Sequence, residues 1–249
     1  MTERVLIVPA AGRGTRLRTP LPKALVEVNQ RPMLAHIVDL YSKFVDRFVI
    51  VVSPFAESAA RKFAKGCQPS CEILVQDQPT GMLDAILVPL KALKRSGARQ
   101  IWITWCDQIA IRPETIRKLD SICSRNEDWN VVLPTLMRRH PYIHIERNGE
   151  GIIENILQRR EGDQMPEVGE SDMGLFALSD PAYFNLLPVY ASAAPASRTT
   201  HERNFLPFIT WLKDRRGVRT IEGTHYMETV GINTQHELKL VEEWLARVR

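Results

Sequence analysis

The stretch Arg4-Val5-Leu6-Ile7-Val8-Pro9-Ala10-Ala11-Gly12-Arg13-Gly14 decides how the chain begins to fold. Residues 4–11 are mostly apolar and rich in β-branched side chains, and two glycines follow almost at once. A short apolar run that ends in glycines predicts a buried strand feeding a sharp turn. Strands buried on both faces are typical of parallel sheets covered by helices.

The pattern that follows alternates between helix and strand. Apolar residues recur every three or four positions over residues 33–44, which predicts a helix, and residues 48–52 form a compact β-branched run. The order repeats, with helices expected at 57–65, 84–94 and 113–123 and strands at 72–75, 100–104 and 130–133. We therefore expect an α/β fold: a three-layer α/β/α, Rossmann-like domain around a mostly parallel mixed sheet.

The second half of the sequence is less regular. Residues 142–147 and 151–157 flank Asn148-Gly149, a dipeptide typical of β-hairpin turns. We expect a loop at 158–171, a mobile segment at 190–200 and helices at 204–215 and 235–248. No repeat and no linker divides the sequence, so residues 1–249 are predicted to form a single domain.

Composition bounds the possible partners. Of 249 residues, 44% are hydrophobic, and 33 basic against 29 acidic side chains give a net charge of +4. So small a charge for this length favours neither nucleic acid nor a membrane surface as a partner. The chain has no apolar run of roughly 18 residues that would span a bilayer, no signal-peptide pattern at its start, and four cysteines without zinc-site spacing. We expect a cytoplasmic protein with reduced thiols.

The glycine turn carries the first chemical signal. Gly12 and Gly14 can present backbone N–H groups to an anion, and Arg16 and Lys23 bring positive charge to the same loop. A third glycine is missing, so this is not the dinucleotide fingerprint, and the sequence has no Gly-Lys-Ser/Thr triplet of a P-loop. The residues predict a phosphate-binding loop that is neither a dinucleotide-binding loop nor a P-loop.

Residues 8–17, followed by Pro22-Lys23 and Arg31-Pro32-Met33-Leu34, resemble the signature of the sugar-1-phosphate nucleotidyltransferases. The resemblance implies that the glycine loop wraps a nucleoside triphosphate and that Arg16 and Lys23 are the catalytic cations. The nucleotide-binding residues that it implies are Ala10, Ala11, Gly12, Gly14, Thr15 and Arg16. The nearest pattern is the pyrophosphorylase part of N-acetylglucosamine-1-phosphate uridylyltransferase. Hexapeptide repeats are absent here, so acetyl transfer is not expected.

Three further segments match this family in order. Residues 76–85 resemble its base-reading segment, which makes Gln76 and Gly81 candidates for contacts with the base. Asp107 follows an apolar strand, where open α/β sheets place their ligands, and it stands at the family's metal-ligand position. Asn233, in Gly231-Ile232-Asn233, is the implied second ligand of a Mg²⁺ ion.

The central region resembles the family more loosely. By their places in the matching segments, Tyr142, Glu154 and Asp172 are candidates for contacts with the acceptor. Arg138 and Arg139 are interpreted first as solvated charge, with a contact to the acceptor's phosphate as an alternative.

The resemblance predicts a Mg²⁺-dependent nucleotidyltransferase that joins a nucleoside triphosphate (UTP, CTP or dTTP) to a phosphorylated small-molecule acceptor, a sugar 1-phosphate, and releases pyrophosphate. A cytidylyltransferase for a phosphorylated amino alcohol such as phosphocholine is the alternative within the class. A nucleotide-binding regulatory protein without catalysis is the alternative outside it. The sequence leaves open whether the chain forms a homo-oligomer.

Overall fold

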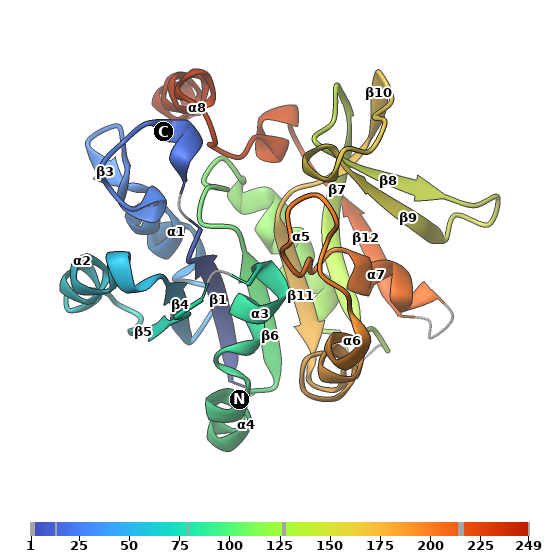
Figure 1. Cartoon of the computed structure of the whole chain (residues 1–249), viewed down its shortest axis with the longest axis horizontal. Helices are drawn as coiled ribbons and strands as arrows, with labels where there is room; N and C mark the ends of the chain where they lie inside the picture. The colour runs from blue at the N-terminus through green and yellow to red at the C-terminus, as the bar shows by residue number, and fades with distance from the viewer. Residues whose placement is uncertain (1–2, 13, 79, 126–127, 214–216, 249) are drawn as a thin grey trace.

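The fold is organised around the predicted first strand, β1 (Arg4–Ala10), which lies in the middle of the molecule (Figure 1). The computed structural model describes residues 3–12, 14–78, 80–125, 128–213 and 217–248. Six of the seven residues of β1 are buried, as expected of a strand covered on both faces.

The strands around β1 are parallel. β4 (Arg47–Val52) pairs with β1 on one side, with Ala10 opposite Val52, and β5 (Cys71–Val75) continues outward from β4. β6 (Gln100–Thr104) pairs with β1 on the other side. The chain therefore crosses from one side of β1 to the other, and the carboxyl ends of these four strands meet at one edge of the sheet, where open α/β sheets bind ligands.

Beyond β6 the sheet continues with antiparallel pairs, and β12 rejoins β7 in parallel. The strand order is β5-β4-β1-β6-β11-β7-β10-β8-β9, and a short hairpin, β2 with β3, stands apart from it. The remaining strands are β2 (Glu27–Val28), β3 (Arg31–Pro32), β7 (Val131–Arg139), β8 (Ile143–Arg147), β9 (Ile153–Gln158), β10 (Val168–Asp172), β11 (Leu175–Ser179) and β12 (Val218–Glu222).

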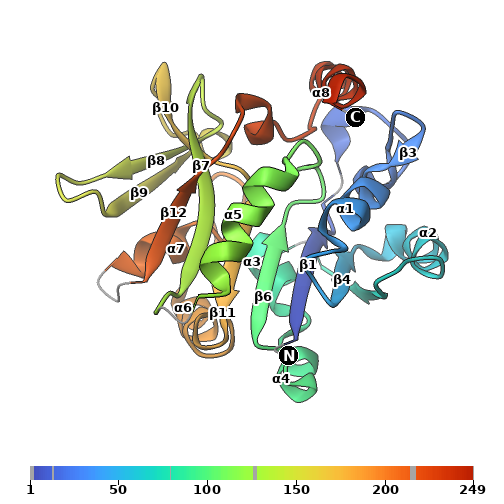
Figure 2. The same cartoon turned by 180° about the vertical axis from the view of Figure 1, so that it is seen from behind.

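Helices cover both faces of the sheet (Figures 1 and 2). On one face α1 (Met33–Tyr41), α2 (Pro54–Ala64), α5 (Pro113–Cys123) and α8 (Gln235–Val248) share an apolar core with Leu6 and Val8 of β1. On the other face α3 (Met82–Leu87), α4 (Leu90–Ser96), α6 (Leu187–Ala193) and α7 (Pro207–Trp211) pack with Val5 and Ile7. Successive strand residues alternate between these two cores. The predicted three-layer α/β/α architecture with a mixed sheet is confirmed.

Several local predictions need correction. The helix expected at 84–94 is two helices, α3 and α4, separated at Val88 and Pro89, because proline lacks an N–H and interrupts the helical ladder. The loop expected at 158–171 contains most of β10, whose polar strand is held by antiparallel pairing with β7. Residues 190–193, expected to be mobile, end α6. Of the helix expected at 204–215, α7 covers Pro207–Trp211.

Candidate active site

The glycine loop leaves the carboxyl end of β1 and turns back on itself at Gly14. Gly14 has a φ of +60°, and a Cβ there would lie 2.8 Å from Cβ of Lys23. A side chain at this position would therefore be strained and would push the lysine away. The carbonyl of Gly14 accepts a hydrogen bond from the N–H of Leu17 at 3.0 Å, which closes the short helix that Thr15 begins. Arg13 lies outside the described residues.

Four of the predicted residues meet beside this turn. The Lys23 ammonium donates to the carboxylate of Asp107 and, at 2.8 Å, to the amide oxygen of Asn233. Arg16 donates to the same Asn233 oxygen at 3.0 Å. These side chains come from the glycine loop, the end of β6 and the segment before α8, so the fold unites motifs that lie up to 217 residues apart.

The electrostatic balance keeps Lys23 positively charged. Burial on its own lowers the pKa of Lys23, whereas the charge of the Asp107 carboxylate and its hydrogen bond to the lysine raise it, against a smaller opposing effect of Arg16. The resulting pKa lies above the ordinary 10.5. Burial also raises the pKa of Cys106 to about 12, so this thiol stays neutral at pH 7. The site thus holds a permanent cation against one carboxylate.

Gly231 and Glu228 hold the segment of Asn233 in place. A Cβ on Gly231 would lie 3.3 Å from the carboxylate of Asp107, and the N–H of Ile232 donates to the Asp107 carbonyl at 3.2 Å. Glu228 is fully buried and accepts hydrogen bonds from the backbone N–H groups of Arg112, Thr224 and His225. Glu228 thus connects two loops, a role that the sequence analysis did not identify.

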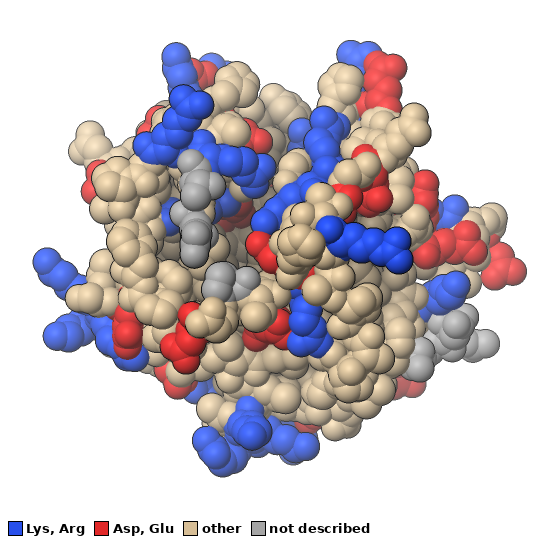
Figure 3. Space-filling model, in the orientation of Figure 1, with Lys and Arg blue, Asp and Glu red and all other residues tan. Residues whose placement is uncertain are grey.

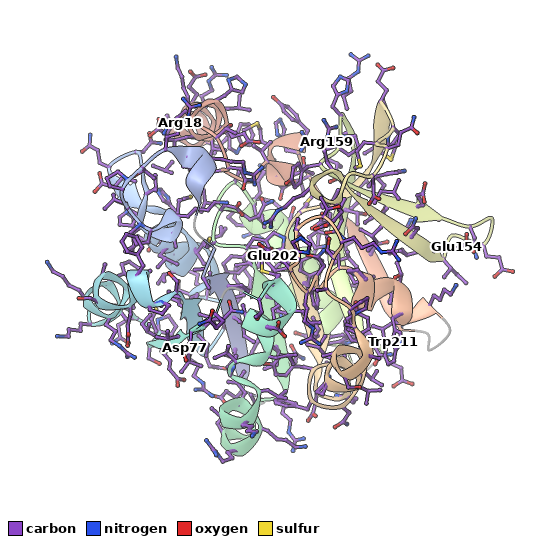
Figure 4. The ribbon with its side chains drawn as sticks, viewed as in Figure 1. Arg18, Asp77, Glu154, Arg159, Glu202 and Trp211 are labelled. Atoms are coloured by element: carbon purple, nitrogen blue, oxygen red, sulfur yellow. The ribbon has the colours of Figure 1, made fainter. Side chains whose placement is uncertain are left out.

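A pocket of about 370 Å³ adjoins the glycine loop. It brings together several residues predicted to bind the nucleotide, namely Ala10, Ala11, Gly12 and Gln76. Gln76 is buried, and its amide donates to the hydroxyl of Thr80 and to the carbonyl of Gly81, both at 3.3 Å. Asp77, at the pocket rim, is labelled in Figure 4. Among the described residues no hydrogen bond to the side-chain carbonyl of Gln76 is found.

The sequence analysis did not identify Ser53, Pro54 and Phe55, which also line this pocket. They follow β4 directly and begin α2, so they lie at the same sheet edge as Ala11. The rule that pointed to Asp107, that ligands gather after parallel strands, also applies to them. Phe55 is 73% exposed, so its ring offers apolar surface beside the pocket.

The backbone of Arg203 passes so close to residue 81 that only glycine fits there. Its φ is +128°, and a Cβ there would lie 2.4 Å from the Arg203 nitrogen and 2.5 Å from its carbonyl oxygen. The N–H of Arg203 donates to the Thr80 carbonyl at 2.8 Å, and the N–H of Leu83 donates to the Arg203 carbonyl at 3.0 Å. The segment around Arg203 therefore fixes the loop that holds Gln76.

The structure separates the three candidates for acceptor contacts. The Tyr142 ring lies 6.0 Å from the Arg16 guanidinium carbon, within reach of a cation–π contact. Asp172 ends β10. Burial raises the pKa of Asp172 to about 6. The hydrogen bond from the Gly174 N–H lowers this pKa, and the nearby charge of Asp107 raises it further. Glu154 is exposed on the outer hairpin and points away from the other site residues (Figure 4). The fold does not bring it to the site.

The donor set at Asp107 and Asn233 fits a hard divalent cation. One oxygen of each residue contacts the same Lys23 nitrogen, so both oxygens face one position suited to positive charge. Mg²⁺ is held by few protein oxygens and completes its shell with water and phosphate. Over the described parts of the chain, no three His, Cys, Asp or Glu side chains gather as a metal cage. The residues therefore fit a metal shared with a phosphate ligand.

Comparison with known proteins places this geometry in a family. Residues 6–168 match the family described as the MobA-like NTP transferase domain, a range that covers more than half of the 249 residues. The chain belongs to this family. The expectation of a nucleotidyltransferase is thereby confirmed at the level of the family.

The similar curated proteins agree with the predicted resemblance. The Bifunctional protein GlmU of Halalkalibacterium halodurans is 25% identical over 99% of this chain and 53% of its own length. That of Mycobacterium marinum is 24% identical over 95% of this chain and 49% of its length, and that of Rhodopseudomonas palustris is 36% identical over 48% of this chain and 26% of its length. The chain thus spans about half the length, or less, of these relatives.

A solved structure confirms the fold. A protein from Bacillus anthracis assigned as a glucose-1-phosphate thymidylyltransferase superposes with a TM-score of 0.78 over 99% of this chain and 96% of its own, at 16% identity. In the described part of our chain, no helix combines the length and apolarity needed to cross a bilayer.

Proposed function

We propose that the chain transfers a nucleotidyl group from a pyrimidine nucleoside triphosphate (UTP, CTP or dTTP) to a sugar 1-phosphate, with Mg²⁺, and releases pyrophosphate. The observation that carries this proposal is the convergence of Lys23 and Arg16 on the oxygens of Asp107 and Asn233, beside the pocket of Gln76. Family membership, the GlmU relatives and the thymidylyltransferase-like fold support it.

The reaction needs no nucleophile or general base from the protein. An oxygen of the acceptor's phosphate, already ionised at pH 7, forms a bond to the α-phosphorus, while the bond from the α-phosphorus to the bridging oxygen breaks and pyrophosphate carries away the electron pair. The protein's part is to align the two phosphates and to neutralise their charge. Lys23 is suited to this because its pKa stays above 10.5 although the side chain is buried.

The remaining roles follow from position. Gly12 lines the pocket, and the backbone N–H groups of Gly12 and Gly14 can approach phosphates closely. Asp107 and Asn233 would hold Mg²⁺, and the ion supplies Lewis-acid charge neutralisation at the phosphates when bound. Gln76 can read a base edge with its side-chain carbonyl, which can accept a hydrogen bond. Arg16 can move between the Asn233 oxygen and a phosphate, since its side chain is exposed.

The test is pyrophosphate release by the pure protein with MgCl₂, each of five nucleoside triphosphates, and a panel of sugar 1-phosphates plus phosphocholine. We expect release with one pyrimidine nucleotide and a sugar 1-phosphate. Lys23→Ala should reduce the rate by about a hundredfold to a thousandfold, because it removes a cation aimed at the reacting phosphates. Lys43→Ala, at an exposed lysine outside the site, is the matched control and should keep the rate.

Other outcomes separate the rival functions. Release with CTP and phosphocholine alone would replace the sugar phosphate by an amino-alcohol phosphate. A thermal shift with one nucleotide but no release with any acceptor would favour a regulatory protein that binds nucleotide. If the protein shows no nucleotide binding and releases no pyrophosphate, the proposal is overturned. The cytoplasmic location remains a prediction, and the sequence makes none about the oligomeric state.

A further inference from the structure

A hollow opens in the molecule, and basic side chains lie on both of its sides (Figure 3). The base loop, residues 76–78 and 80–83, carries Gln76 and Gly81, and the acceptor lobe, residues 131–172, carries Tyr142. A linking segment, residues 197–204, contacts both. In the view of Figure 4, Glu202 of this segment lies between Asp77 of the base loop and Arg159 of the acceptor lobe.

The acceptor lobe holds the linking segment through Glu161. The carboxylate of Glu161 accepts hydrogen bonds from the Ser197 hydroxyl, from the Thr200 hydroxyl at 2.9 Å and from the Asn204 amide at 2.9 Å. The backbone carbonyl of Glu161 accepts another from the Thr199 hydroxyl at 2.9 Å. One glutamate therefore contacts four residues of the linking segment.

Arg160 adds a second attachment to the same segment. Two nitrogens of its guanidinium donate to the two carboxylate oxygens of Glu202 at 2.8 and 2.7 Å, the bidentate geometry of a strong pair. Burial raises the pKa of Glu161, but the hydrogen bonds from the linking segment and the charge of Arg160 lower it by more, so this pKa lies below the ordinary 4.5. Both attachments are therefore charge-assisted at pH 7.

The other end of the linking segment holds the base loop through the backbone of Arg203. Its N–H donates to the carbonyl of Thr80 at 2.8 Å, and its carbonyl accepts from the N–H of Leu83 at 3.0 Å. Arg203 thus contacts the loop on both sides of Gly81. The carbonyl of Gly81 in turn accepts from the Gln76 amide at 3.3 Å.

Glu161 is also connected to the candidate acceptor contact Tyr142. The short helix Arg159–Glu161 begins where the N–H of Arg159 donates to the Tyr142 carbonyl at 3.0 Å. The Arg159 guanidinium donates to the Pro141 carbonyl at 3.1 Å. Residues 197–204 are all described and form neither helix nor strand, so their order depends on contacts such as those of Glu161. Hydrogen bonds and short stretches of backbone therefore join Tyr142 to Gln76.

We propose that Glu161 is a positioning residue for the base pocket: it holds the linking segment, which holds the base loop, so that a ligand at Tyr142 and a nucleotide at Gln76 bind cooperatively. A ligand at Tyr142 restrains the helix Arg159–Glu161 and with it the linking segment, and the nucleotide then meets a base loop that is already ordered. The inference rests on the proposed function for the identity of the two ligands, a phosphorylated acceptor and a nucleoside triphosphate.

The first test needs no ligand. Hydrogen–deuterium exchange of the full chain, measured by mass spectrometry on peptides that contain Leu83, reports how firmly the base loop is held. Glu161→Ala should speed this exchange about fivefold or more, because local opening becomes easier. Glu161→Gln keeps one accepting oxygen and should give an intermediate rate. Glu150→Ala, at an exposed glutamate of the same lobe, is the matched control and should change nothing.

The second test measures cooperativity. Calorimetry in MgCl₂ gives the Kd of the α,β-methylene analogues of UTP, CTP and dTTP, in which carbon replaces the oxygen whose bond would break, so that no transfer occurs. Each is titrated with and without saturating glucose 1-phosphate or N-acetylglucosamine 1-phosphate. For the tightest analogue, we expect the more effective sugar phosphate to strengthen binding about fivefold or more in the wild type and less than about twofold in Glu161→Ala. A merely structural role would weaken the nucleotide equally with and without the sugar phosphate.

The inference is overturned if Glu161→Ala leaves the exchange of the base loop unchanged. It is also overturned if neither sugar phosphate strengthens nucleotide binding in the wild type, including the case in which no analogue binds, or if the ratio of the two Kd values is the same in the variant. A wild-type chain that binds the analogues but releases no pyrophosphate refutes the proposed function instead, while the exchange rates and the Kd ratio still decide the inference.

Discussion

Glu228→Gln is a nearly isosteric change that tests whether the buried carboxylate braces the active site. One oxygen of Glu228 accepts from the Thr224 N–H at 2.8 Å, the Thr224 hydroxyl at 2.7 Å and the His225 N–H at 2.8 Å. The other accepts from the Arg112 N–H at 2.9 Å. Glutamine has a single accepting oxygen, so one of these two sets must lose its acceptor.

The cost follows from that count. If the glutamine carbonyl keeps the three donors at Thr224 and His225, its NH₂ group faces the Arg112 N–H, and two donors meet in a fully buried place. Loss of one charge-assisted hydrogen bond together with a stranded donor costs about 2–4 kcal/mol. For a chain of this length, each kcal/mol lowers Tm by roughly 2–4 °C, so Tm should fall by about 5–15 °C.

Activity should fall with stability, because Glu228 joins the loop after Asp107 to the segment before Asn233. We expect kcat for pyrophosphate release to drop about tenfold or more below the melting transition, with a smaller change in KM for the nucleotide. Calorimetric melting and a pyrophosphate assay on Glu228→Gln check this, with exposed Glu222→Gln as the control that removes the same charge. A Tm within about 2 °C of the wild type, with kcat unchanged, would refute the reasoning.

Three further outcomes are expected. Gly81→Ala should raise KM for the nucleotide far more than it lowers kcat, because a Cβ 2.4 Å from the Arg203 backbone must displace the loop that holds the base pocket; a KM within twofold of the wild type contradicts this. Burial raises the pKa of Asp172 from 3.8 to about 6, so the folded state keeps its proton to higher pH than the unfolded chain, and stability falls as pH rises between these two values. Asp172→Asn should abolish that fall and stabilise the metal-free protein at pH 7.5 by roughly 2–3 kcal/mol, measured by urea unfolding in EDTA at pH 4.5 and 7.5. Glu161→Ala should increase proteolytic cleavage near Asn204, because the Glu161 carboxylate accepts from the Asn204 amide at 2.9 Å; an unchanged digestion pattern would count against that role.

Local patterns predicted the elements whose structure is decided locally. β1 and its glycine turn could be read from one stretch of sequence, and α5 and α8 begin and end where their apolar periodicity predicts. β10 could not be predicted in this way, because its sequence is Val-Gly-Glu-Ser-Asp and it becomes a strand through pairing with β7. Strand formation depends on such tertiary partners more than helix formation does.

The same distinction applies to the candidate site: some residues could be predicted from local motifs, and others only from the fold. Ordered motifs identified Lys23 and Asp107, and the fold brings them into contact. Glu154 was assigned by its place in a loosely matching segment, and strand geometry turns it to the exposed side of the hairpin. Phe55 was missed because nothing in its own segment marks it; it enters the pocket since β4 lies beside β1 and the two strands end together, with Ala10 opposite Val52.

The segment that pairs with Asp107 shows what a motif match leaves unexplained. The triplet Gly231-Ile232-Asn233 was matched as a unit, yet each member does something different. Ile232 fixes the segment through a backbone hydrogen bond to Asp107, and Asn233 supplies the oxygen that Lys23 and Arg16 share. Gly231 is needed because a Cβ would lie 3.3 Å from the Asp107 carboxylate and 3.2 Å from the Gln108 amide, tighter than ordinary packing allows. The glycine thus brings the backbone of Asn233 close enough for the two oxygens to face one cation.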